Sequence, residues 1–539
     1  QYQEYYYMFE DRILPDRYEE SLPDVFPNFA PGNFTWQNKI EKWVWTTFYP
    51  FQWDLDYSNP EVFRRMFEEL MTIVNLGVDV LRLDAVPFLW KRMETNCQNQ
   101  PEAHFLLQAY RALVRMVAPG TLFKSEAIVA PDDIIKYLGV GGYENKECDL
   151  AYNATLMNHL WQALATQNTQ LLRTTLANLP QAPKTSSWIN YIRCHDDIGW
   201  GISDENARAI DQNGFEIRKF CTDFYSGALP NSYAEGYEFS RDENTREARI
   251  SGTAAALSGL QKAQIESNHV EKKRAIKRLQ LLNSVIFSMK GIPVIYSGDE
   301  VGQLNDFSYL TDYYKKYDNR WVHRPAMDWK KAELRHQPGT VEHQLFAGLQ
   351  QLLDGRKNIG AFHARSDEQI FDIPVESLFA LERSYQDEDI LLLSNFSDSP
   401  IRFPISQLPG NWQAPLFWDR MADANLHFTF REITLPAYGY LWLSPTTEAV
   451  RKKNIQQSIS VEMHTEWGED VYIVGNIKEM GNWNTANAVG PFNADDYPTW
   501  KATLKVPEHS VFEYKFVKKR DNHTVWESPS THWMRTYGT

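Results

Sequence analysis

Gly77-Val-Asp-Val-Leu-Arg-Leu-Asp-Ala85 is a short run rich in valine and leucine that ends in polar residues. Such a run is typical of a strand buried in a parallel sheet. Before it, apolar residues between 62 and 74 recur on one helical face, and Asn59 with Pro60 supplies an N-cap and a first-turn proline. The sequence therefore predicts a helix that ends at Gly77 and leads into the strand.

The same helix-then-strand unit recurs along the chain. Repetition of this unit predicts an α/β fold with a parallel sheet, arranged as a (β/α) barrel. The further units are helix 101–117 with strand 122–128, helix 131–138 with strand 149–153, helices 154–178 with strand 188–193, and helix 271–289 with strand 292–297.

Other segments do not follow this pattern of helix and strand. Residues 1–57 are aromatic and proline-rich, and 198–250 is a polar insertion, so both are expected to be loop subdomains over one barrel face. Short alternating strands beyond residue 360 predict antiparallel β structure. The expected domains are the tail of a loop subdomain (1–57), the barrel (58–360, with the insertion 198–250), an antiparallel β domain (361–445), a polar linker (446–457) and a β-sandwich module (458–539).

Composition limits the function classes. The 539 residues are 43% hydrophobic and 23% charged, as in soluble globular proteins of several domains. The formal net charge of −15 argues against nucleic acid and anionic membranes as partners. We find no apolar run long enough to span a membrane, and the four cysteines are too few for a disulfide framework. The compartment stays open, with a cytoplasmic location favoured over secretion.

Three carboxylates follow predicted strands: Asp84, Glu126 and Asp196. In a barrel, catalytic groups lie at the carboxyl ends of the strands, so these side chains are expected to converge. Cleaving a glycosidic bond with retention needs a nucleophilic carboxylate and a protonated carboxylic acid about 5 to 5.5 Å apart. Each acid taken singly could instead cap a helix or lie in a solvated loop. Their corresponding positions in successive units favour the catalytic interpretation.

Neighbouring residues assign different roles to the first two acids. Arg82 lies two residues before Asp84, so both side chains point to the same side of the strand, and an adjacent guanidinium favours an ionised carboxylate. Glu126 lies between Phe123 and an Ala-Ile-Val segment, an apolar setting that favours the protonated acid. Asp84 is therefore expected to act as nucleophile and Glu126 as acid.

Three motifs carry a specific resemblance to a known family. Gly77 to Val86, Lys124-Ser-Glu-Ala-Ile128 and Arg193-Cys-His-Asp-Asp-Ile-Gly-Trp200 resemble the ordered motifs of glycoside hydrolase family 13, with the amylosucrase subgroup as the best match. Supporting matches are Trp43 to Phe48, Phe51 to Leu55, Ile295 to Gly302 and Asp318 to Pro325. The resemblance implies Asp84 as nucleophile, Glu126 as general acid/base and Asp196 as the third carboxylate that holds sugar hydroxyls. It also implies a glucosyl pocket completed by Arg82 and His195.

The resemblance implies further binding residues. Phe48 would stack on the glucosyl ring, Asp197 would bind substrate, and Arg320 would close the pocket by pairing with an acid from an earlier segment. Arg218 and Arg249, in the insertion, would line an acceptor channel. The alternative for these arginines is a solvated position in a loop.

The family's barrel has eight strands, and its nucleophile follows the fourth. Strands 1–3 and the usual Asp-x-x-x-Asn-His motif are not found in the sequence, so a partial barrel of strands 4 to 8 and an amino-terminally truncated chain are expected. Such a piece would leave an open sheet edge and an incomplete sugar-binding shell.

The alternating strands after residue 458 resemble a family 20 starch-binding module, through Trp467 to Gly475, Met480 to Asn484, Tyr497 to Trp500, Phe512 to Phe516 and Val525 to Ser528. By that resemblance Trp483 and Trp526 form a platform for α-glucan with Lys515 beside it. Tyr472 and Tyr497 would contribute to a second platform. The alternative is that these aromatic residues belong to the core, which is the interpretation favoured for Trp500.

The resemblance implies a retaining transglucosylase that takes glucosyl groups from sucrose, releases fructose and elongates α-1,4-glucan. No metal, nucleotide or other cofactor is expected. Within the same family, a sucrose hydrolase or another α-glucosidase is the alternative. In another class, the chain would be a non-catalytic protein that binds α-glucan such as starch, glycogen or maltooligosaccharides.

Overall fold

The computed structural model describes residues 2–243, 245–413, 416–422, 424–426, 431–446, 454–475, 477–508, 511–521, 523–527 and 532–536. At its centre is a five-stranded sheet in the order β10-β7-β6-β5-β4, in which every pair is parallel. This confirms the predicted α/β class, and the sheet is consistent with a partial barrel. The strands are β4 (Val80–Leu83), β5 (Leu122–Ser125), β6 (Leu150–Tyr152), β7 (Ser187–Asn190) and β10 (Ile292–Pro293).

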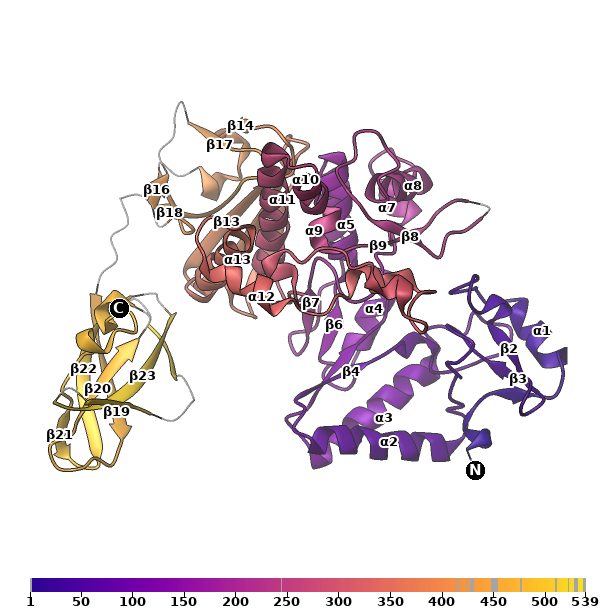
Figure 1. Ribbon diagram of the computed structural model, residues 1–539, viewed down its shortest axis with the longest axis horizontal. Helices are drawn as coiled ribbons and strands as arrows, with labels where there is room; N and C mark the ends of the chain where they lie inside the picture. The colour runs from indigo at the N-terminus through magenta and orange to yellow at the C-terminus, as the bar shows by residue number, and fades with distance from the viewer. Residues whose placement is uncertain are drawn as a thin grey trace.

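Helices connect these strands, and α5 is buried on every side from Leu156 to Leu164. α2 begins where expected, because the Asn59 side chain accepts a hydrogen bond from the Glu61 amide at 3.0 Å and Pro60 occupies the first turn. Figure 1 shows α2 and α3 below β4, at one end of the sheet. The main helices are α2 (Pro60–Asn75), α3 (Pro101–Val117), α4 (Pro131–Ile134), α5 (Ala154–Thr166), α6 (Gln170–Ala177), α11 (His269–Ser288) and α13 (Val341–Lys357).

Two subdomains lie beside the strand ends. The N-terminal one is a small sheet, β1-β3-β2, in which Trp45 is buried against Tyr18 and Phe34. The predicted insertion contains two helices and a two-stranded ribbon as well as loops. These elements are β1 (Met8–Phe9), β2 (Phe34–Gln37), β3 (Lys42–Trp45), α7 (Asp204–Arg208), α8 (Gly214–Tyr225), β8 (Tyr237–Phe239) and β9 (Arg249–Ser251).

Antiparallel β structure follows, as predicted. One sheet has the order β11-β12-β13-β18-β15-β16, and β14 pairs with β17. The strands of these two sheets are β11 (Asp367–Phe371), β12 (Leu378–Tyr385), β13 (Glu388–Asn395), β14 (Ile401–Pro404), β15 (Leu416–Asp419), β16 (Ala424–Leu426), β17 (Glu432–Leu435) and β18 (Tyr440–Thr446).

The C-terminal module is a β unit of its own (Figure 1). It has two small sheets, β19-β22-β21 and β20-β23-β24, with β25 pairing to β23. Because β18 reaches Thr446 and β19 begins at Asn454, strand residues extend into both ends of the expected linker 446–457. The strands are β19 (Asn454–Glu462), β20 (Asp470–Gly475), β21 (Asn493–Asp496), β22 (Thr499–Pro507), β23 (Val511–Arg520), β24 (His523–Trp526) and β25 (His532–Arg535).

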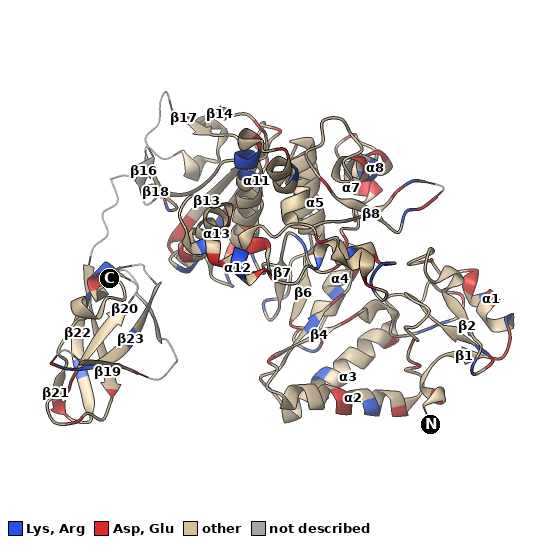
Figure 2. Ribbon diagram, in the orientation of Figure 1, with Lys and Arg blue, Asp and Glu red and all other residues tan. Residues whose placement is uncertain are grey.

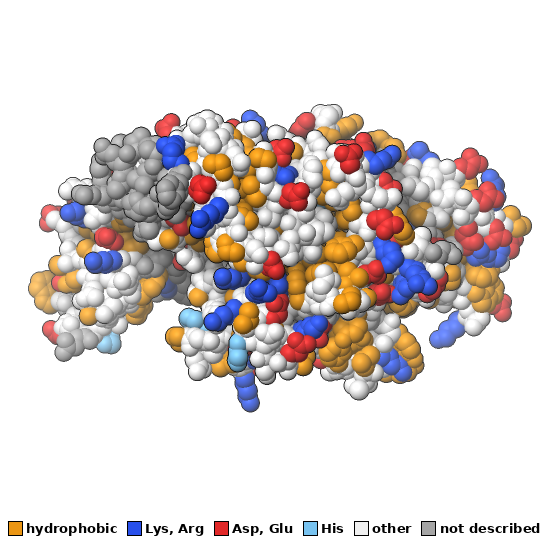
Figure 3. Space-filling model, turned by 90° about the horizontal axis from the view of Figure 1, so that it is seen from above, with side chains coloured by type: hydrophobic (Ala, Val, Ile, Leu, Met, Phe, Trp, Pro, Cys, Tyr) orange, Lys and Arg blue, Asp and Glu red, His pale blue; other side chains and the backbone are white. Residues whose placement is uncertain are grey.

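Charges of both signs are interspersed along the ribbon in Figure 2 and on the face seen in Figure 3. On that face, basic side chains lie beside acidic ones. In the described part of the chain, none of the helices is long and apolar enough to cross a membrane.

Candidate active site

Arg82 lies at the centre of the acidic cluster that the sequence predicts. Its Nη1 donates a hydrogen bond to Asp84 Oδ1 at 2.5 Å, and its Nη2 lies 3.9 Å from Asp196 Oδ2. Asp84 directly follows β4, and its side chain is 73% exposed. One guanidinium therefore joins two acids from different strands and leaves Asp84 open to a substrate.

Glu126 follows β5 and is joined to the same turn. Its amide donates to the Leu83 carbonyl at 2.9 Å, and its Oε2 accepts a hydrogen bond from the Ala85 amide at 2.9 Å. Ala85 has a φ of 48°, which is uncommon for a residue with a Cβ. Burial raises the pKa of Glu126, although the Ala85 amide and Arg82 oppose that shift. The structure thus pairs the exposed carboxylate of Asp84 with the half-buried carboxyl of Glu126, whose pKa is raised by burial.

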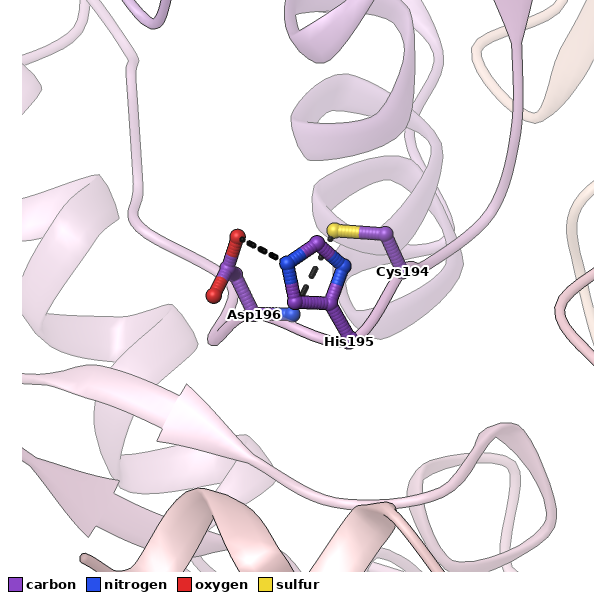
Figure 4. A group of neighbouring side chains, drawn as sticks. All are labelled: Cys194, His195 and Asp196. Carbon is purple, nitrogen blue, oxygen red and sulfur yellow. Dashed lines mark hydrogen bonds and ion pairs between the residues drawn. The ribbon is translucent and has the colours of Figure 1, made fainter. Parts of the chain in front are cut away.

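Asp196 lies beside a histidine. The His195 Nε2 lies 3.1 Å from Asp196 Oδ2, and the Asp196 amide donates to Cys194 Sγ at 3.4 Å (Figure 4). Burial lowers the pKa of His195, so its ring is neutral near pH 7 and can donate a hydrogen bond through only one nitrogen.

The same three residues have ligand atoms within 4.8 Å of one another, a spacing that a metal ion could use. Two guanidinium groups argue against a cation there, since Arg320 Nη1 and Arg324 Nη2 lie 3.4 and 3.3 Å from Asp196 Oδ1. Burial also raises the pKa of the Cys194 thiol to about 12, which keeps it protonated. These groups do not fit a metal ion.

The segment Asp318 to Arg324 clamps the strand end that carries Asp196. The His195 carbonyl accepts hydrogen bonds from His323 Nε2 at 2.9 Å and from Arg324 Nε at 2.6 Å. Burial lowers the pKa of His323 to about 3, so the ring stays neutral and its other nitrogen accepts from the Gly252 amide. The sequence alone assigns no role to His323 or Arg324, although both lie in one of the motifs that resemble the family.

Arg320 is also part of this clamp. Its Nη1 lies 3.8 Å from Asp197 Oδ1, and its Nη2 donates to Tyr49 Oη at 2.6 Å and to Asp318 Oδ2 at 2.8 Å. The expected pairing of Arg320 with an acid from an earlier segment is therefore present, with Asp196 and Asp197 as partners. Asp318 and Tyr49 are further members that sequence reasoning missed.

Asp197 and Arg249 are joined to each other, and Phe48 lies next to the turn that follows Asp84. Arg249 Nη1 donates to Asp197 Oδ2 at 3.4 Å, and burial raises the pKa of Asp197, a shift that Arg249 and Arg320 oppose. The Phe48 ring lies 5.3 Å from Phe88, in the turn after Asp84. The binding roles expected of all three stay predictions.

Arg218 has a different environment. It donates to Glu247 Oε1 at 2.6 Å, to Asp204 Oδ1 at 2.8 Å and to the Ile202 carbonyl at 2.9 Å. These bonds hold the guanidinium within the insertion rather than beside the three carboxylates. Its role in an acceptor channel therefore stays a prediction.

In the C-terminal module, Trp483 and Trp526 form an exposed pair. Their ring centroids lie 6.4 Å apart at an interplanar angle of 40°. Lys515 lies on β23, two residues from Val517, which pairs with Trp526. Val517 also pairs with Tyr472, so the register places Tyr472 in the row of Trp526. The Tyr472 ring is covered by Gly490 and by Lys519 Nζ, 4.8 Å away.

Tyr497 lies elsewhere in the module, with a different neighbour. Its hydroxyl accepts a hydrogen bond from the Thr465 amide at 3.3 Å, in the loop that carries Trp467. Trp467 is 97% exposed, the most exposed of the large hydrophobic side chains in the described part. The sequence alone assigns Trp467 no role, although it begins one of the module's motifs; its full exposure on a loop is the signal that distinguishes it.

Comparison with known proteins gives these two regions their class. Residues 1–202 match the family model described as "Alpha amylase, catalytic domain", and residues 454–539 match the one described as "Starch binding domain". Residues 1–202 are therefore similar to the catalytic domain of α-amylases, and residues 454–539 are similar to a starch-binding domain. The amylosucrase subgroup is not singled out by these matches.

The relatives have several activities. The chain is 28% identical over 307 residues to the trehalose synthase/amylase TreS of Mycolicibacterium smegmatis, covering 57% of this chain and 45% of that one. It is 27% identical over 425 residues to the glucosylglycerate phosphorylase of Escherichia coli, covering 78% and 70%. The chain thus spans less than half the length of the first relative.

A solved structure supports the fold. The sucrose 6F-phosphate phosphorylase from Thermoanaerobacter thermosaccharolyticum superposes with a TM-score of 0.53 at 19% identity, over 74% of each chain.

Proposed function

We propose that this chain is a retaining transglucosylase that takes a glucosyl group from sucrose, releases fructose and adds glucose to an α-1,4-glucan. The observation that carries the proposal is the unequal pair of acids at neighbouring strand ends. Asp84 is exposed and held by Arg82, whereas Glu126 is half-buried with a raised pKa. Retaining glycosidases divide the roles of nucleophile and acid in this way.

In the first step an Asp84 oxygen attacks the anomeric carbon of the glucosyl unit, and the bond to the fructosyl oxygen breaks. The Glu126 proton passes to that oxygen, so fructose leaves as a neutral alcohol. In the second step Glu126, now ionised, takes the proton of the acceptor hydroxyl. That oxygen displaces Asp84 and restores both acids.

Asp196, His195 and Arg82 would hold the hydroxyls of the glucosyl ring during both steps. The Asp196 carboxylate is held in position beforehand by hydrogen bonds from Arg320 and Arg324. Hydrogen bonds held in position before the reaction stabilise the transition state without reorganisation. The starch-binding module favours glucan over water as acceptor, because it would keep glucan chains near the site.

A phosphorylase is the second candidate, since relatives that match over 70% or more of the chain are named glucosylglycerate phosphorylases. Inorganic phosphate would then take the place of the glucan hydroxyl. A sucrose hydrolase would instead use water as acceptor, and a non-catalytic protein would bind glucan without turning sucrose over. The products formed from sucrose distinguish these four cases.

The test is to incubate the chain with sucrose and to measure fructose, free glucose, glucose 1-phosphate and glucan length, with and without phosphate or maltoheptaose. Fructose in excess of glucose, with longer glucan, supports the transglucosylase. Equal fructose and glucose indicates a hydrolase, and glucose 1-phosphate indicates a phosphorylase. Absence of fructose under all conditions would contradict the proposal.

A further inference from the structure

A second group of exposed aromatic side chains lies in the loop that leads into the clamp. Residues 307–317, which include the short turn Ser308–Thr311, run directly into Asp318. Within this segment Tyr313 is 73%, Tyr314 90% and Tyr317 73% exposed. Three such rings within five residues leave a large apolar area in water, which is common at binding sites and unusual elsewhere.

The lysines of the loop support these rings. Lys316 Nζ lies 5.4 Å from the Tyr313 ring and 4.8 Å from the Tyr317 ring, in cation–π contact with both. Lys315 Nζ lies 4.5 Å from the Trp321 ring and 3.6 Å from Asp312 Oδ2. Both ammonium groups are thus engaged within the segment, which favours a neutral ligand over an anion.

The loop is continuous with the acidic site. Asp318 accepts hydrogen bonds from Arg320, which also reaches Asp196. Across Asp318 lies a further exposed ring: Phe51, 77% exposed, stacks on Tyr49, whose hydroxyl lies 3.3 Å from Asp318 Oδ2. Phe51 thus adds an exposed aromatic ring near Asp318, the residue that follows the tyrosine segment in the sequence.

We propose that the tyrosines of residues 313–317 bind the α-glucan chain beside the active site, as a stacking surface separate from the starch-binding module. The apolar faces of glucose units suit aromatic rings, and tyrosine hydroxyls can bond to sugar hydroxyls. Glucan is uncharged, so the net charge of −15 does not oppose it. This inference rests on the proposed function for the identity of the ligand, and it can be tested by binding alone.

The experiment uses the full chain carrying W483A, W526A and W467A, so that the exposed rings of the module no longer contribute. Maltoheptaose binding is measured by isothermal titration calorimetry with and without Y313A, Y314A and Y317A. We expect the three tyrosine substitutions to weaken binding at least tenfold. Tyr143→Ala is the matched control, because the Tyr143 ring is also in contact with a lysine, Lys146. Tyr143 precedes β6, so it lies toward the amino end of that strand, whereas the three carboxylates follow the carboxyl ends of their strands.

Unchanged maltoheptaose affinity would overturn the proposal, and so would a chain that binds no maltoheptaose once the module is silenced. Binding of inorganic phosphate that the tyrosine substitutions abolish, with glucan affinity unaffected, would also overturn it. Y314A alone, at a residue that is 90% exposed, serves if the triple variant unfolds at a lower temperature. Fructose release from sucrose is measured separately, and its absence would contradict the proposed function but not the binding surface.

Discussion

At the scale of single residues, Asp84 is the nucleophile of the proposed function. An asparagine at this position keeps the shape and can still accept a hydrogen bond from Arg82, but a neutral amide cannot form the glucosyl ester. Asp84→Asn should therefore lower fructose release from sucrose at least about a thousandfold. Steady-state rates and sucrose binding are measured on the same preparation. Turnover within tenfold of the unmodified chain, with the fold intact, would contradict the assignment.

The raised pKa of Glu126 leads to a prediction about the stability of the fold as well as about catalysis. Burial raises its folded-state pKa above the ordinary value of 4.5, so the folded state binds its proton more tightly than the unfolded state does. Stability is then complete below pH 4.5 and falls as the pH rises through the folded-state pKa. Glu126→Gln should remove this loss of stability. Compared with the unmodified chain, the variant should therefore have a higher unfolding midpoint at pH 8 relative to its midpoint at pH 4.

The check is thermal unfolding of both proteins across that range, together with a substrate whose leaving group needs no proton. The variant should lose turnover of sucrose and keep reaction with the activated substrate. Equal loss on both substrates would exclude Glu126 as the acid. Glu333→Gln, at a side chain that is 65% exposed, is the matched control for the same substitution at a surface position.

At the scale of elements, the buried Arg383 and the half-buried Arg356 hold the end of α11. Arg356 donates to the carbonyls of Phe287 and Gly291, and Arg383 donates to the Ser288 carbonyl at 2.8 Å. Burial, with the nearby Arg383 charge, lowers the pKa of Arg356 to about 10. Unbonded carbonyls at the end of a helix need such donors when they are buried.

Arg383→Met should lower the free energy of unfolding by about 3 kcal/mol, because it leaves a buried carbonyl and the Ser366 hydroxyl without their donor. Urea unfolding measures the change. Arg365→Met, at an exposed position in the preceding turn, should change it by less than about 0.5 kcal/mol. A loss of similar size in both variants would mean that the hydrogen bonds to α11 are not responsible.

The elements show what the sequence could predict. The helix-then-strand units were predictable because apolar periodicity and Asn59, Pro60 and Gly77 mark their ends. Asp84, Glu126 and Asp196 could be grouped because parallel strands end at one edge of the sheet. The bond from His323 to the His195 carbonyl joins residues 128 apart in sequence, and Arg193 reaches Asp299 across 106. No local pattern encodes such pairs, so they needed the structure.

At the scale of the whole molecule, buried histidines should make the fold sensitive to acid. Burial lowers the pKa of His159 to about 4 and that of His323 to about 3, from an ordinary value of 6.5. Between the lowered pKa of each histidine and 6.5, the unfolded state binds more protons than the folded state does. The stability is therefore present above pH 6.5 and is lost as the pH falls. His159 alone should contribute about 3 kcal/mol to this loss.

Unfolding midpoints in urea between pH 7 and pH 4.5 measure the effect. His159→Gln should flatten the dependence of stability on pH. His336→Gln, at a side chain that is 64% exposed, is the matched control for the same substitution at a surface position. A midpoint that stays constant over this range in the unmodified chain would contradict the prediction.

The starch-binding module forms a β unit of its own and presents Trp483 and Trp526 to solvent, 36% and 43% exposed. Losing an aromatic stacking face costs on the order of 1 to 3 kcal/mol per ring. The double variant W483A/W526A of the full chain should therefore lose retention on a starch column and keep its turnover of sucrose, since neither ring contacts the acidic site. Trp329→Ala, which removes a 67% exposed tryptophan outside the module, is the matched control and should elute unchanged. Full retention of the double variant would mean that starch binds through other residues, with Trp467 and Tyr497 as the first to substitute.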